Sequence, residues 1–202
     1  MKLLRPTLVV GIGGSAGALN AYKTFLDALP SNTGMAFVIV SHITPAANSQ
    51  LAQILSRHTK MKVAVASTAI LIRADHVYVI PPDVDLLVNG KMLKVISPRS
   101  KRNVQVDLFF TSLAKAMGPR AVGIIFSGFD GDGTEGCRQI KANGGNTFAQ
   151  DATAQIAEMP LSAQAAGCID FVLPPEEIPG ELNRLVNALN RYLPGYSSGQ
   201  PA

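Results

Sequence analysis

Hydrophobic and polar positions along this chain alternate in a way that predicts strands and helices in turn. Apolar, β-branched runs, which are typical of buried parallel strands, are each followed by a segment with apolar residues at helical spacing. The predicted strands are residues 7–12, 35–41, 62–66, 77–80, 121–126, 146–150 and 169–173. The predicted helices are residues 18–29, 45–58, 104–117, 134–143, 161–166 and 175–193.

This alternation favours a three-layer α/β/α fold. It indicates a doubly wound, mainly parallel sheet of about seven strands between two layers of helices. Residues 84–96 depart from the pattern, because two alternating runs flank Asn89-Gly90, which is a strong hairpin signal. We interpret this segment as a β-hairpin inserted into a single domain, residues 1–193. Residues 194–202 are rich in Gly, Ser and Pro, and we expect a disordered tail there.

The composition narrows the class of protein. Hydrophobic residues make up 47% of the chain and charged residues 16%, which favours a globular protein over a disordered one. The net charge of +4 is mild, and the local basic cluster of Arg99, Lys101 and Arg102 lacks interleaved aromatic residues. We therefore expect no nucleic-acid partner, and an acidic protein substrate would account better for the positive net charge.

Cysteine usage and hydropathy favour a cytoplasmic protein. Cys137 and Cys168 are far apart in the sequence and lack metal-ligand spacing, which favours a reducing compartment and no metal site. No apolar run approaches the ~18–20 residues of a membrane span. The N-terminus has the outline of a signal peptide, but Pro6 interrupts it and cleavage would remove the first strand.

The glycine-rich turn after the first strand carries Ser15 and has three interpretations. Gly13-x-Ser15-x-Gly17 matches the nucleophile elbow, in which small neighbours let the backbone turn sharply and expose the hydroxyl. Gly11-x-Gly13-x-x-Ala16 also fits the dinucleotide-binding fingerprint. The third interpretation is a tight strand-to-helix turn in which Ser15 caps the helix.

Two further polar residues follow strands of the predicted sheet. His42 ends the second strand, and Asp132 lies in the loop after residues 121–126. The carboxyl ends of parallel strands share one edge, so Ser15, His42 and Asp132 can converge there. A serine hydroxyl needs an imidazole to take its proton, and the imidazole needs a carboxylate to fix its tautomer. These residue types therefore predict a Ser-His-Asp triad.

Each partner of Ser15 also has a plainer interpretation. His42 alone could be a core-edge histidine with a satisfied hydrogen bond. Asp132 with Glu135 resembles an N-terminal helix cap. A calcium loop starting at Asp130 fails, because Glu135 stands where that loop needs glycine and no acidic residue closes it.

Two larger alternatives fit the sequence less well. A dinucleotide-binding fold has an acidic residue at the end of the second strand, where this chain has His42. An α/β-hydrolase places its triad in the order Ser, Asp, His, whereas the order here is Ser15, His42, Asp132.

With these segments in view, the chain resembles the catalytic domain of CheB-type chemotaxis protein-glutamate methylesterases. The resemblance covers residues 7 to 190, and its segments occur in order along the chain. They are GGSAG at 13–17, SHxxP at 41–45, HVYVIPP at 76–82, VDxFF at 106–110, SGxxxDGTxG at 127–136, AQD at 149–151, MP at 159–160 and VLPP at 172–175.

The resemblance implies a serine hydrolase that removes methyl esters from glutamate side chains of membrane chemoreceptors and releases methanol. Some members of the family also deamidate receptor glutamines. By position, Ser15 would be the nucleophile, His42 the general base and Asp132 its orienting carboxylate. The backbone N–H groups of Ala16 and Phe129 would form the oxyanion hole.

The same resemblance sets the expected partners. They are a methylated chemoreceptor or another helical signalling protein, with a methyltransferase as a further candidate, and no cofactor. Met159 and Pro160 would bind the substrate. The first strand begins by residue 7, so we expect no receiver domain.

Departures from the family pattern concern substrate docking. Glu158 stands where a small glycine is common, and Asn103-Val104 occupies an Arg-Pro position. They keep open a non-catalytic signalling or binding module of the same fold, and a nucleotide-binding oxidoreductase is a more distant third.

Overall fold

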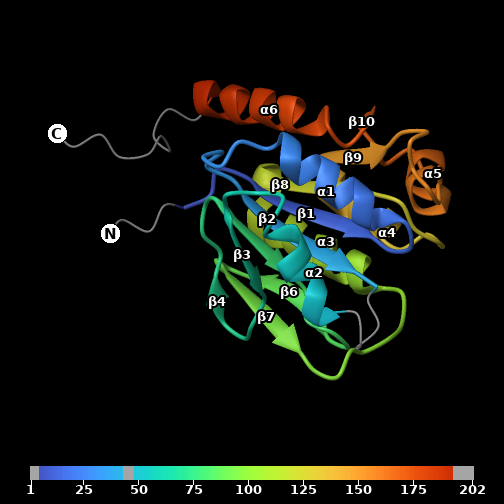
Figure 1. The fold of residues 1–202 in the computed structure, drawn as a ribbon. Helices are drawn as coiled ribbons and strands as arrows, with labels where there is room; N and C mark the ends of the chain where they lie inside the picture. The colour runs from blue at the N-terminus through green and yellow to red at the C-terminus, as the bar shows by residue number, and fades with distance from the viewer. Residues whose placement is uncertain (1–4, 43–47, 193–202) are drawn as a thin grey trace.

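A seven-stranded sheet in which every strand pair is parallel forms the centre of the molecule (Figure 1). The computed structural model describes residues 5–42 and 48–192. The strand order is β10-β9-β8-β1-β2-β5-β3. These strands are β1 (Val9–Gly14), β2 (Ala36–Ser41), β3 (Lys62–Val65), β5 (His76–Val79), β8 (Ala121–Ile125), β9 (Asn146–Gln150) and β10 (Phe171–Leu173).

Helices cover both faces of this sheet, because successive residues of a buried strand point to opposite sides. Val10 of β1 belongs to the core cluster that includes α1, α2 and α6, whereas Val9 belongs to the cluster that includes α3, α4 and α5. The helices are α1 (Ala18–Ala28), α2 (Asn48–Leu55), α3 (Gln105–Met117), α4 (Thr134–Ala142), α5 (Glu158–Ala165) and α6 (Ile178–Tyr192), with a short 3-10 helix at Gly118–Arg120. The predicted α/β/α layering and its seven strands are confirmed.

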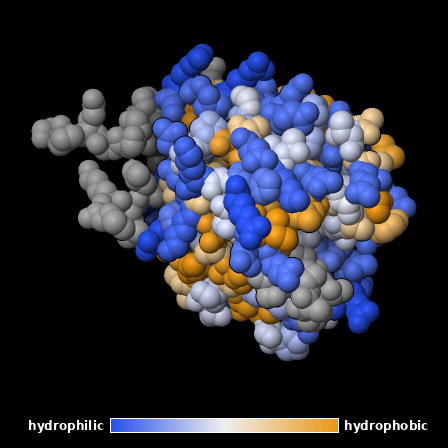
Figure 2. Space-filling model, viewed as in Figure 1, coloured by the Kyte–Doolittle hydropathy of each residue, from blue (hydrophilic) through white to orange (hydrophobic). Residues whose placement is uncertain are grey.

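The predicted hairpin is also present, as β6 (Asp85–Asn89) paired antiparallel with β7 (Met92–Ile96). It belongs to a second, three-stranded sheet, because β4 (Ile70–Leu71) pairs with β7. Strand β4 was not predicted, since two residues are too few for a hydrophobic period. Hydrophobic side chains gather over this side of the molecule in Figure 2, and Val65 and Met92 are among the exposed ones.

Several predicted boundaries were wrong by a few residues. Helix α5 begins at Glu158 rather than at residue 161, because Pro160 is tolerated in a first helical turn, where its missing N–H has no partner to lose. Helix α6 begins at Ile178 rather than 175, after a turn in which the Glu177 N–H donates to the Pro174 carbonyl. Helix α2 ends at Leu55 rather than 58, and β10 begins at Phe171 rather than 169.

Two expectations fall on parts of the chain that the structure does not describe. They are the start of the second helix at residue 45 and the tail at 194–202. Within residues 5–42 and 48–192, no helix has both the length and the apolar character that a bilayer span requires.

Candidate active site

Ser15 and His42 leave the sheet side by side. Gly14, the last residue of β1, is paired with Ser41, the last residue of β2. Ser15 and His42 each directly follow one of these two strands, and neighbouring strands lie about 4.8 Å apart. Strand β8 lies on the other side of β1. After β1 the chain adds β2, β3 and β5 on one side of this strand, and it then returns to add β8, β9 and β10 on the other side. Open α/β sheets bind ligands outside the strand ends at this kind of switch point.

The turn that carries Ser15 leaves the serine side chain unused by the fold. Gly17 is the N-cap residue of α1, and no side chain caps this helix, so the interpretation of Ser15 as a helix cap is wrong. Gly17 has a φ of 78°, and a Cβ there would lie 2.6 Å from Ser127 Oγ. The Ser15 hydroxyl makes no hydrogen bond to any described residue.

His42 and Asp132 are in direct contact. His42 Nε2 lies 2.5 Å from Asp132 Oδ2, and the two side chains are 11% and 0% exposed. A neutral imidazole carries one N–H and one lone-pair nitrogen. When Nε2–H donates to Asp132, Nδ1 is the nitrogen left to accept a proton from a hydroxyl. The hydrogen bond that the plainer interpretation of His42 expected is present, and its partner is the Asp132 carboxylate.

The Asp132 carboxylate also holds the N-terminus of a different helix from the one it precedes. Its Oδ2 accepts the Val106 N–H at 3.0 Å, and its Oδ1 accepts the Asp107 N–H at 2.9 Å. These are the second and third residues of α3, whose own N-cap position, Val104, has no side-chain acceptor. The expectation that Asp132 caps the following helix is wrong, because α4 follows Gly133 and has no side-chain cap from its N-cap residue. Helix N-terminal amides stabilise a buried anion of this kind.

Asp107 completes a reciprocal arrangement. Its Oδ1 accepts the Gly136 N–H at 2.7 Å, and Gly136 is the third residue of α4. Burial raises the pKa of the Asp107 carboxyl, and the nearby Asp132 charge adds to the rise. Asp107 belongs to the VDxFF segment at 106–110 that resembles the family, but no role was predicted for it.

Ser127 is a second residue whose role the sequence did not reveal. It is fully buried, and its hydroxyl donates to the Ala16 carbonyl at 2.8 Å and accepts the Ile156 N–H at 2.9 Å. Its carbonyl accepts the Ser15 N–H at 2.9 Å. Ser127 therefore connects the turn that carries Ser15 with the β8–α4 loop and with the segment before α5. Its place at the head of the SGxxxDG segment was the only available signal.

Ala16 directly follows Ser15, and Phe129 directly follows Gly128, which lies close to Ser15. Neither N–H donates to an acceptor within residues 5–42 and 48–192. Phe129 follows Gly128, where a Cβ would lie 3.0 Å from the Ser15 Cβ and would collide with the Met159 sulfur. The absence of a side chain at Gly128 thus allows the loop to approach Ser15 closely.

Met159 and Pro160 are buried at the start of α5. Met159 is only 1% exposed, and its N–H donates to the Gly128 carbonyl at 3.0 Å. This places Met159 beneath the loop that carries Phe129. The large apolar side chains exposed in these segments are Phe129, at 53%, and Leu161, at 57%.

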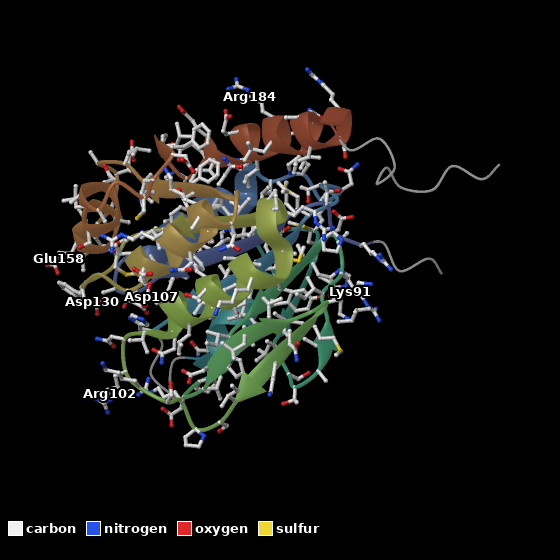
Figure 3. All side chains as sticks on the ribbon, turned by 180° about the vertical axis from the view of Figure 1, so that it is seen from behind. Lys91, Arg102, Asp107, Asp130, Glu158 and Arg184 are labelled. Atoms are coloured by element: carbon white, nitrogen blue, oxygen red, sulfur yellow. The ribbon has the colours of Figure 1, made fainter. Side chains whose placement is uncertain are left out.

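Three acidic residues, Asp107, Asp130 and Glu158, lie toward the same end of the molecule in Figure 3. Glu158 Oε2 accepts the Asp130 N–H at 3.3 Å, and Asp130 Oδ1 accepts the Asp132 N–H at 2.9 Å. The described residues include no group of three His, Cys, Asp or Glu that could hold a metal ion.

Comparisons with known proteins agree on one family. The sequence profile of the family described as CheB methylesterase matches residues 10–182. The crystal structure of the Thermotoga maritima CheB methylesterase catalytic domain matches with a TM-score of 0.81 at 27% identity, over 88% of this chain and 98% of that one. A relative from Leptospira interrogans is 36% identical over 171 residues, which are 83% of this chain and 89% of the relative.

Another relative is longer than this chain. A protein of Hydrogenovibrio crunogenus named protein-glutamate methylesterase/protein-glutamine glutaminase is 32% identical over 185 residues, and the match covers 88% of this chain but 49% of the relative. The fold, the family profile and these relatives agree, and they indicate an ester hydrolase. The chain belongs to the CheB methylesterase family.

Proposed function

We propose that this protein is a cytoplasmic protein-glutamate methylesterase acting on methylated chemoreceptors, and that residues 1–193 form its catalytic domain. The observation that carries the proposal is the contact of His42 with the buried Asp132. His42 and Ser15 follow the ends of two adjacent strands, and no described residue engages the Ser15 hydroxyl. The substrate class follows the names of relatives such as the Hydrogenovibrio protein. Deamidation of glutamine side chains uses the same acyl chemistry and is included in the proposal.

In the first half of the reaction, Ser15 Oγ attacks the carbonyl carbon of the glutamyl methyl ester. His42 Nδ1 takes the hydroxyl proton, and the Nε2–H bond to Asp132 stabilises the imidazolium that forms. The ester carbonyl oxygen becomes an oxyanion, and the N–H groups of Ala16 and Phe129 stabilise its charge.

The intermediate then collapses, and His42 returns the proton to the departing methoxide, which leaves as methanol. The glutamyl group remains bonded to Ser15 as an ester. In the second half, His42 removes a proton from a water molecule that attacks this ester. His42 then returns this proton to Ser15 Oγ as the bond between Ser15 and the glutamyl group breaks. The products are a free glutamate side chain and regenerated Ser15, and neither half of this reaction uses a cofactor. A glutamine substrate would release ammonia in place of methanol.

Digests of methylated receptor membranes, analysed by mass spectrometry before and after incubation with the protein, test the substrate class. We expect glutamyl methyl esters in the receptor helices to be converted to glutamates, with matching release of methanol. Free glutamate methyl ester serves as a comparison, because it lacks the receptor helix. Receptor peptides that keep every methyl ester under these conditions would overturn the proposed substrate.

A further inference from the structure

A cavity of about 500 Å³ lies at the end of the sheet opposite Ser15. It forms where β1 begins at Val9, where α3 ends at Met117, and where the β6–β7 turn carries Lys91. Figure 3 shows Lys91 at the far end of the molecule from Asp107 and Asp130. The cavity is therefore separate from the candidate active site, and neither the family assignment nor the proposed reaction uses it.

The charge of this cavity has one sign. Four basic side chains line it, Arg5, Arg73, Lys91 and Arg120, and the described lining residues include no Asp or Glu. Arg5, Arg73 and Lys91 form no ion pair with any residue of the described ranges. Several cations that line one cavity attract an anionic ligand. The planar fork of an arginine suits the paired oxygens of a phosphate.

The rest of the cavity wall is apolar. Val9 and Ile72 are 0% and 5% exposed, and Leu71 and Met117 are partly buried around the same space. A bare inorganic ion would leave the partly exposed side chains of Leu71 and Met117 in contact with water. Cavities of about 300–1,000 Å³ with apolar walls and a few convergent polar groups are typical of sites for small organic ligands.

The wall is held in place by the protein itself. The buried Tyr78 hydroxyl donates to the Leu71 carbonyl and accepts the Arg73 N–H, both at 3.0 Å. The Ile72 N–H donates to the Lys91 carbonyl at 2.9 Å, which joins the segment after β4 to the β6–β7 turn. The backbones that carry Arg73 and Lys91 are thus fixed relative to each other, and a ligand does not have to order them.

We propose that this cavity binds a small organic phosphate of nucleotide size. The basic side chains contact its phosphate groups, and its organic part lies against Leu71 and Met117. Helix α3 ends at this cavity, and backbone N–H groups at its other end donate to the Asp132 carboxylate. The ligand would therefore contact the same helix that supports the candidate triad.

Isothermal titration calorimetry with ADP, inorganic pyrophosphate and adenosine tests the proposal. We expect ADP to bind one site per chain, more tightly than pyrophosphate, while adenosine shows the weakest binding. The double variant Arg73→Glu/Lys91→Glu should weaken ADP binding about tenfold or more. The matched control is Lys94→Glu/Arg102→Glu, which changes the net charge equally at residues that do not line the cavity.

The outcomes separate this proposal from the proposed reaction, because binding is measured without any ester substrate. The Ser15→Ala variant should bind ADP as the wild type does. Absence of ADP binding overturns the proposal, and so does equal loss of binding in the control double variant. Pyrophosphate binding as tight as ADP binding would overturn the organic part of the ligand.

Discussion

Asp132 and Asp107 hold the N-termini of each other's helices. Asp132, just before α4, accepts two backbone N–H groups of α3, and Asp107, in the first turn of α3, accepts one N–H group of α4. The two helices are thereby joined through the carboxylate that contacts His42. The position of the proposed triad acid is in this way part of the packing between α3 and α4.

Replacing Asp107 should disturb the triad without touching it. Asp107→Ala removes the acceptor of the Gly136 N–H and should lower the free energy of unfolding by about 1 kcal/mol. It should also lower kcat, because Asp132 loses part of its support. Asp107→Asn retains a side-chain oxygen as acceptor and should restore most of both quantities. Urea unfolding and methanol-release kinetics measure the two effects, and a full loss of kcat in Asp107→Asn would contradict the positioning role.

Asp107 should also leave a signature in the pH dependence of stability. Burial raises its pKa above the ordinary value of 3.8, so the folded state holds the proton more tightly than the unfolded chain. The unfolding free energy that Asp107 contributes therefore falls as pH rises from below that value through the raised pKa. Comparison of the wild type with Asp107→Asn across this range should show the wild type losing stability relative to the variant. A relative gain by the wild type would contradict the sign.

Asp132→Asn should abolish most activity with a smaller effect on folding. The amide cannot carry the negative charge that stabilises protonated His42, and loss of the triad carboxylate costs about 10⁴ in kcat in other serine hydrolases. The side-chain oxygen still accepts one of the two α3 amides, so we expect destabilisation of about 1–2 kcal/mol. Thermal unfolding and kcat separate the two effects. A variant that keeps wild-type kcat would remove Asp132 from the mechanism.

Gly128 should tolerate no side chain while Met159 is present. A Cβ at this position collides with the Met159 sulfur and lies 3.0 Å from the Ser15 Cβ, so Gly128→Ala should displace the loop that carries Phe129. We expect at least a tenfold loss in kcat/KM, since displacing an oxyanion donor costs about 10²–10³. The double variant Gly128→Ala/Met159→Ala opens space on one side and should recover part of the loss. Additive losses in the two variants would rule out this contact as the cause.

Ser127→Ala should weaken the connection between the turn that carries Ser15 and the segment before α5. The substitution leaves the Ala16 carbonyl and the Ile156 N–H without their side-chain partner and should cost about 1–3 kcal/mol of stability. Ser67→Ala, at an exposed position, is the control and should be neutral. Thermal unfolding of the two variants gives the comparison, and equal midpoints would contradict the role of Ser127.

The sequence predicted the sheet well because buried parallel strands are continuous apolar runs, as in residues 36–41. The edge that Ser15 and His42 share followed from the same rule, since each residue directly follows one of two adjacent strands. Strand β4 was missed because its two residues have no period of their own.

The partners of Asp132 could not be predicted for a different reason. A cap is normally sought within the helix's own sequence, whereas Asp132 lies 26 residues from Val106. Only the tertiary packing of α3 against α4 brings these residues together. The reciprocal contact of Asp107 with Gly136 has the same origin. The local sequence pattern therefore identified Asp132 but not the α3 backbone N–H groups that bind its carboxylate.

The most direct test of the central claim is methanol release from methylated receptor membranes by the wild type, Ser15→Ala and the control Ser67→Ala. Because no described residue depends on the Ser15 hydroxyl, Ser15→Ala should fold with an unchanged thermal midpoint and lose at least about 10³ in rate. Ser67→Ala should match the wild type. Methanol release by Ser15→Ala at the wild-type rate would contradict the account.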